Sequence, residues 1–80
     1  MSSDPIRRQV ADVFSLVLRR RVGPDESVSA EVEPAWDSLK QVELVFAVED
    51  ALGVRFDAEE LPGLTSLARV VDAVVRLRDA

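Results

Sequence analysis

The chain has 80 residues, a formal net charge of −5, no cysteine and no histidine. A chain of this length forms one domain, residues 1–80, whose small core excludes a large internal active site. Without cysteine it has no disulfide or thiolate metal site, and without histidine it lacks the commonest general base and metal ligand.

Acidic side chains concentrate in the middle of the chain. Residues 25–60 hold eleven acidic residues against Lys40 and Arg55, whereas residues 1–24 and 61–80 carry a net positive charge. Such charge keeps a protein soluble, repels nucleic acid and favours basic protein surfaces. No apolar stretch is long enough for a membrane span and no signal peptide is visible, so we expect a cytoplasmic monomer with no nucleic-acid or membrane partner.

A first helix is predicted to begin at Asp4-Pro5, with aspartate as N-cap and proline at the first helical position. Its apolar residues recur at helical spacing; they are Ile6, Val10, Val13, Phe14, Val17 and Leu18. Arg19–Arg21 are expected in its last turn, where cations suit the helix dipole, although they could also form a basic binding patch. Gly23-Pro24 ends the helix.

Residues 24–36 are predicted to form a long ordered loop anchored by Val28 and Val32. A second helix is expected from Ser38 to Leu52, ending at Gly53. The extended link that follows should place Val54 and Phe56 in the core.

The last third of the chain is predicted to contain two helices. A short helix over residues 58–61 is broken by Pro62-Gly63, and Thr65 caps a final helix over residues 66–77. Its apolar stripe consists of Leu67, Val70, Val71, Val74, Val75 and Leu77. The sequence therefore predicts an all-α fold, a small four-helix bundle of three main helices plus one short helix.

The helix over residues 38–52 has two apolar stripes, more than one buried face needs. The stripe expected to enter the core consists of Leu44, Val45, Val48 and Leu52. The second stripe consists of Leu39, Val42 and Phe46, and the acidic residues that flank it are Glu43, Glu49 and Asp50. A short bundle could absorb part of the second stripe, but apolar residues edged by acids also indicate a docking surface.

Ser38 stands at the start of this helix, where a serine commonly acts as a cap. A catalytic serine would need a nearby base and an oxyanion hole. The chain has no histidine, and Lys40 is two positions on and faces away on a helix, so we expect no enzyme. A serine modified by another protein remains, because a helix N-terminus stabilises a phosphate ester.

The chain resembles the acyl carrier protein family in a series of short motifs. They are Asp37-Ser38-Leu39, Val42-Glu43-Leu44, Phe46, Glu49-Asp50, Leu52-Gly53-Val54 and Leu64-Thr65-Ser66-Leu67. The match covers nearly the whole chain and is strongest over residues 35–75. Asp-Ser-Leu is weak alone, but the combination in a chain of this length is specific.

The resemblance implies a 4′-phosphopantetheine arm on Ser38, attached from coenzyme A by a phosphopantetheinyl transferase. The arm would hold acyl or aminoacyl cargo as a thioester, and its imported thiol fits the absence of cysteine. Asp37 would help to hold the transferase's Mg²⁺, although the chain itself would carry no resident metal.

The resemblance also implies that residues 38–52 face partner enzymes with basic docking patches, which load, condense or tailor the cargo. The acidic residues that would steer these partners are Asp37, Glu43, Glu49 and Asp50. The residues that would make apolar contact are Leu39, Val42 and Phe46. The cargo would fold into a cleft beside this helix.

The sequence departs from the family pattern at three places. Trp36 replaces a small residue, Pro34-Ala35 replaces a common Leu-Gly, and Lys40 replaces an acid of fatty-acid carriers. The indole either shields the cargo or packs the loop. The resemblance implies a carrier of a fatty-acid, polyketide or specialised-metabolite pathway, and these departures favour a secondary-metabolite or other specialised pathway. An aminoacyl or peptidyl carrier and an unmodified helical adaptor are the alternatives.

Overall fold

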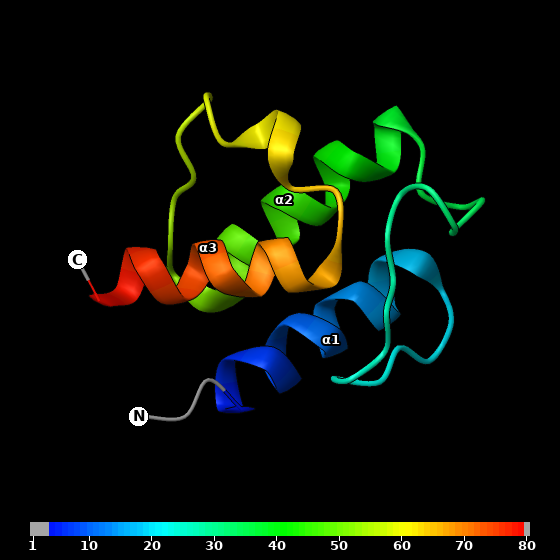
Figure 1. Ribbon diagram of the computed structural model, residues 1–80, viewed down its shortest axis with the longest axis horizontal. Helices are drawn as coiled ribbons and strands as arrows, with labels where there is room; N and C mark the ends of the chain where they lie inside the picture. Colours follow the sequence, from blue (N-terminus) through cyan, green and yellow to red (C-terminus); the bar gives the residue numbers. More distant parts are fainter. Residues whose placement is uncertain (1–3, 80) are drawn as a thin grey trace.

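The computed structural model describes residues 4–79, which form three α-helices and a short 3₁₀-helix (Figure 1). The elements in chain order are α1 (Asp4–Leu18), α2 (Ser38–Leu52), η1 (Leu61–Gly63) and α3 (Leu67–Asp79). Helix α1 packs against both α2 and α3. No strand occurs in the described part of the chain, so the predicted all-helical bundle is confirmed.

One stripe from each α-helix meets in a common core. The largest side chains that are fully buried are those of Val10, Phe14, Leu44, Val48, Leu67, Val71 and Val74. Their spacing of three and four residues places them on one side of each helix. In the link after α2, Phe56 is buried and Val54 is half-buried against the core, which agrees with the prediction for these two residues.

The two apolar stripes of α2 have different environments. The inward stripe, Leu44, Val45, Val48 and Leu52, is buried as expected. The second stripe stays at the surface: the exposed fractions are 67% for Leu39, 49% for Val42 and 65% for Phe46. The bundle therefore does not absorb the surplus apolar residues of α2.

The predicted end of the first helix was wrong. Helix α1 ends at Leu18, and Arg19 adopts a left-handed conformation with a φ of 59°, so the arginines lie beyond the last turn. Because the helix ends early, the chain turns back and the side chain of Val22 is buried. The N–H of Val22 donates to Ser15 Oγ at 2.8 Å. The predicted cap by the side chain of Asp4 lies outside the described part of the structure.

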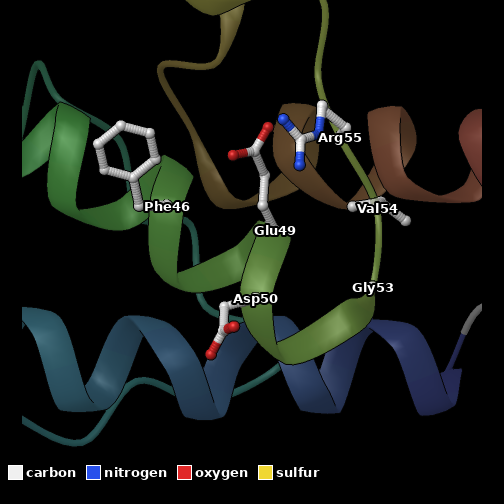
Figure 2. Close-up of a pocket in the computed structure, with 6 residues that line it drawn as sticks. All are labelled: Phe46, Glu49, Asp50, Gly53, Val54 and Arg55. Atoms are coloured by element: carbon white, nitrogen blue, oxygen red, sulfur yellow. The ribbon is translucent and has the colours of Figure 1, made fainter.

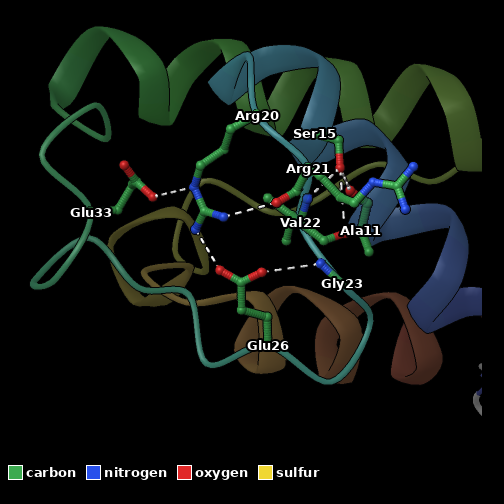
Figure 3. A network of polar contacts seen from close by, with 8 residues as sticks. All are labelled: Ala11, Ser15, Arg20, Arg21, Val22, Gly23, Glu26 and Glu33. Atoms are coloured by element: carbon green, nitrogen blue, oxygen red, sulfur yellow. Dashed lines mark hydrogen bonds and ion pairs between the residues drawn. The ribbon is translucent and has the colours of Figure 1, made fainter.

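Arg20 ties the long loop to the end of α1 (Figure 3). Its Nε donates to Glu33 Oε1 at 2.9 Å and its Nη2 to Glu26 Oε2 at 2.6 Å. Glu26 also accepts from Gly23 N–H at 3.2 Å. The hydrogen bond from Arg20, followed by that from Gly23, lowers the pKa of Glu26. This arginine acts as a clamp on the loop and does not belong to a free basic patch.

The short helix is a 3₁₀-helix and lies further along the chain than predicted. Residues 58–60 form a turn, and η1 includes both Pro62 and Gly63, which we had expected to break the helix. Proline is tolerated in a first turn because its missing N–H would have no intrahelical partner there. Gly63 N–H donates to Glu60 O at 2.9 Å, which closes the turn.

The last helix has a different cap from the predicted one. Ser66 Oγ accepts from Arg69 N–H at 3.1 Å, so the serine and not Thr65 caps α3. Thr65 is exposed, and its carbonyl accepts from Ala30 N–H at 2.9 Å in the loop. The same loop buries Val28 as predicted.

Val32 does not anchor the loop as predicted. Its side chain is 69% exposed, because residues 30–35 form turns at the surface, whereas Val28 is buried in the core.

We predict that Leu44→Ala lowers the free energy of unfolding by about 2–4 kcal/mol, because it leaves a cavity at a residue only 2% exposed. The matched control is Leu39→Ala on the outward stripe, which should cost within about 0.5 kcal/mol. Urea denaturation followed by circular dichroism measures both. Equal losses would contradict the division of α2 into an inward and an outward face.

Candidate functional site

The N-terminus of α2 leaves a serine hydroxyl at the surface. Asp37 is the N-cap: its backbone is extended, and its Oδ1 accepts from Lys40 N–H at 2.9 Å. Ser38 is the first helical residue and is exposed. Since the aspartate fills the capping role, Ser38 is not needed as a cap and lies at the positive end of the helix dipole.

An open depression of about 430 Å³ lies beside Ser38. Its lining residues come from the end of the long loop, the first turn of α2 and the η1 segment: Ala30, Trp36, Asp37, Ser38, Gln41, Leu61, Pro62 and Thr65. Apolar side chains make up much of this lining. The serine predicted as an attachment point therefore lies at the edge of an apolar hollow.

Trp36 packs into the core and forms one wall of this depression. The side chain is only 5% exposed, and its ring meets that of Phe14 edge to face, with centroids 5.3 Å apart. Its Nε1–H donates to Gln41 Oε1 at 2.7 Å. Of the two alternatives for the indole, packing of the loop is thus the one that the structure shows.

Gln41 joins the start of α2 to the segment around η1. Its Oε1 accepts from Trp36, and its Nε2 donates to Leu61 O at 3.2 Å and to Leu64 O at 2.9 Å. We call these three hydrogen bonds the Gln41 amide network. Sequence reasoning missed this residue, although a signal existed: Gln41 continues the helical spacing of the inward stripe of α2, where a polar side chain needs buried partners.

The outward face of α2 combines the exposed apolar stripe with acidic residues in different situations. Glu43 Oε2 accepts from Lys40 Nζ at 3.2 Å, so part of its charge is compensated within the helix. Glu49 is half-buried, and its Oε2 accepts from Phe56 N–H at 2.8 Å, which holds the link after the helix. Asp50 is exposed. The acids thus share one helix but differ in how freely a partner could reach them.

A second hollow of about 480 Å³ lies at the C-terminal end of α2 (Figure 2). Its lining residues are Phe46, Glu49, Asp50, Gly53, Val54 and Arg55. Gly53 ends the helix with a φ of 65°, a left-handed conformation that glycine adopts without strain. Figure 2 shows the guanidinium of Arg55 extending toward the carboxylate of Glu49. The outward face therefore ends in a groove with charges of both signs.

The described residues include no helix long and apolar enough to cross a bilayer. Within the same part of the chain, no three side chains of the metal-ligating types come together as a group that could hold an ion.

No family model matches the chain, but a curated protein is similar to it over most of its length. A curated protein from Saccharopolyspora erythraea, named acyl carrier protein, is 32% identical over 83 aligned residues. The alignment covers 92% of this chain and 87% of that protein. The similarity thus extends over nearly the full length of both.

The assignment of the cap predicts a difference between two neighbouring substitutions. Asp37→Ala should lower the free energy of unfolding by about 1 kcal/mol, because it removes an N-cap. Ser38→Ala should change it by less than about 0.5 kcal/mol, because that hydroxyl is exposed and does not cap the helix. Thermal denaturation compares the two variants. A larger loss for Ser38→Ala would identify the serine as the cap after all.

Proposed function

The chain belongs to the acyl carrier protein family, a family of carriers rather than enzymes, and we propose that Ser38 is the residue to which a 4′-phosphopantetheine arm is attached. Coenzyme A would be the source of the arm, and a phosphopantetheinyl transferase would attach it. Once attached, the arm would supply the thiol that holds acyl intermediates as thioesters. The chain has no thiol of its own.

The observation that carries this proposal is the exposed hydroxyl of Ser38 beside a capping Asp37. A modifying enzyme can reach an exposed hydroxyl, and no helix cap is lost when it is esterified. The N–H groups of the first turn and the positive end of the helix dipole favour the negative charge of a phosphodiester at this place. Asp37 directly precedes Ser38, and we propose that its carboxylate helps to hold the transferase's Mg²⁺.

The outward face of α2 is the proposed surface for partner enzymes. The side chains of Leu39, Val42 and Phe46 are exposed, so a partner could cover them and make apolar contact. The acidic residues proposed to guide basic patches toward the arm are Asp37, Glu43, Glu49 and Asp50. Asp50 is the freest of them in the structure, because the other three carboxylates each accept a hydrogen bond within the chain.

The partners we propose act in a fatty-acid, polyketide or specialised-metabolite pathway. The pair between Lys40 and Glu43 lowers the net negative charge close to Ser38 and supports a specialised pathway over fatty-acid synthesis. We also propose that the carrier works as a cytoplasmic monomer. An aminoacyl cargo would use the same arm and the same face of α2.

Incubation with a broad-specificity phosphopantetheinyl transferase, Mg²⁺ and coenzyme A tests the attachment site. We expect the mass of one arm per chain by intact-mass spectrometry, and no added mass on Ser38→Ala. The control is Ser27→Ala, at an exposed serine in the long loop, which should accept the arm as the wild type does. A folded wild-type chain that gains no mass would favour an unmodified adaptor.

The docking face makes a separate prediction about rates. Phe46→Ala should lower kcat/KM of the transferase for the carrier by roughly 5- to 30-fold, because an exposed aromatic anchor at an interface contributes about 1–2 kcal/mol. Leu16→Ala is the control, since Leu16 is 80% exposed and belongs to α1, so it is not part of the outward face of α2. Initial rates at subsaturating carrier give the ratio. Equal rates for both variants and the wild type would remove Phe46 from the docking face.

A further inference from the structure

We propose that Arg55 determines which partners the outward face of α2 accepts. It disfavours a partner whose basic patch extends over the C-terminal end of the helix, and it favours a partner that places an acidic side chain there. This inference rests on the proposed function, because it takes the outward face of α2 as the surface that partner enzymes bind. It adds the chemistry that the partner must present at one defined point.

Arg55 lies in the groove at the end of the outward face (Figure 2). Phe46, the exposed aromatic residue of the outward stripe, lines the same groove. Glu49 and Asp50 also line it, and they are neighbours of Phe46 on the helix surface because they follow it by three and four residues. A partner that covers Phe46 therefore also meets the side chain of Arg55.

The backbone that carries Arg55 is held in place on both sides. Val54 before it is half-buried and Phe56 after it is buried, whereas Arg55 is exposed. Phe56 N–H donates to Glu49 Oε2 at 2.8 Å, and Val54 N–H donates to Glu49 O at 3.2 Å. The link after α2 thus presents the arginine side chain outward from a fixed place beside the helix.

The guanidinium of Arg55 is available to a partner. Residues 25–60 contain two cations, and the other one, Lys40, is paired with Glu43 at 3.2 Å. Arg55 extends toward Glu49, yet it forms no ion pair with any carboxylate of residues 4–79. An acidic side chain of a partner can therefore pair with Arg55 without breaking an ion pair in this part of the chain.

The end of the outward face carries opposite charges on its two edges. In Figure 2, Glu49 and Arg55 extend to one side of the end of α2, and the carboxylate of Asp50 extends to the other. A complementary surface has a basic group opposite Asp50, an acidic group opposite Arg55 and an apolar side chain against Phe46. A wholly basic patch would bring a like charge against Arg55, which disfavours binding.

A cation beyond the C-terminus of a helix also complements the helix dipole. Such a role would change the stability of the carrier, but its effect would not depend on the charge of the partner. The deciding measurement is therefore a rate with a partner enzyme, compared at two ionic strengths, and not a melting temperature.

A phosphopantetheinyl transferase with a wholly basic docking patch is the probe for the first test. We expect Arg55→Gln to raise kcat/KM of this transferase for the carrier by about 2- to 5-fold at an ionic strength of about 0.1 M. The gain should disappear at about 1 M, where the Debye length is about 3 Å. Arg8→Gln, at an exposed arginine of α1, removes the same charge and should leave the rate close to that of the wild type.

Charge reversal on the transferase tests the preference for an acidic side chain. In a set of transferase variants, each basic residue of the patch is replaced in turn by glutamate. With the unchanged transferase, we expect Arg55→Glu to react faster than the wild-type carrier. With one variant of the set, we expect this order to reverse, because the new glutamate then faces Arg55 in the wild type. If Arg55→Glu loses helicity by circular dichroism, Arg55→Gln replaces it, since it adds no negative charge beside Glu49.

The outcomes that would overturn this inference leave the proposed function in place. One is an equal kcat/KM for the wild type and Arg55→Gln, and another is an equal gain for Arg55→Gln and Arg8→Gln at about 0.1 M. A set of transferase variants in which none reverses the order of the two carriers would also overturn it. In each case the carriers still gain one arm on Ser38, whereas absence of any added mass on the wild type would remove the proposed function and this inference with it.

Discussion

The structure depends on the one-sided burial of α2. Leu44, Val45, Val48 and Leu52 hold this helix in the bundle, and no segment within residues 4–79 covers its opposite side. In so short a domain, the helices cannot surround α2 completely. The same packing that stabilises the fold therefore creates an outward apolar stripe, and it places the first turn of α2, with Ser38, at the surface.

Polar groups around the start of α2 are arranged so that the serine hydroxyl takes no part in holding the fold. Asp37 satisfies a backbone N–H of the first turn, and Gln41 satisfies the indole of Trp36 and two loop carbonyls. Ser38 lies between these residues and is exposed. A residue that the fold does not need is free for covalent attachment, and a carrier requires such freedom because its modified and unmodified forms must both fold.

The sequence predicted the elements whose signals are local. Helical spacing identified the three α-helices and the two stripes of α2, and Gly53 identified the end of that helix. These features depend on residues within a few positions of one another, which is the range over which periodicity and capping preferences act. Attachment of the arm to Ser38 stays a proposal, because another enzyme would have to add the arm.

The features that sequence reasoning missed depend on contacts between distant segments. Helix α1 ends early because Val22 must return to the core, which the run of arginines does not reveal. The choice of Ser66 over Thr65 as a cap depends on the loop that pairs with Thr65. The amide network of Gln41 likewise needs the η1 segment to be in place, although the position of Gln41 in the inward stripe was a usable signal.

The central claim is that Ser38 serves as the covalent attachment point of a carrier. Top-down mass spectrometry of the chain isolated from its native cell, with the cargo still attached, tests it most directly. The account predicts chains that carry one phosphopantetheine, with the modified fragment mapped to Ser38 and a thioester-bound group on a fraction of the chains. A native protein whose mass equals that of the bare sequence, or an arm that maps to another residue, would contradict it.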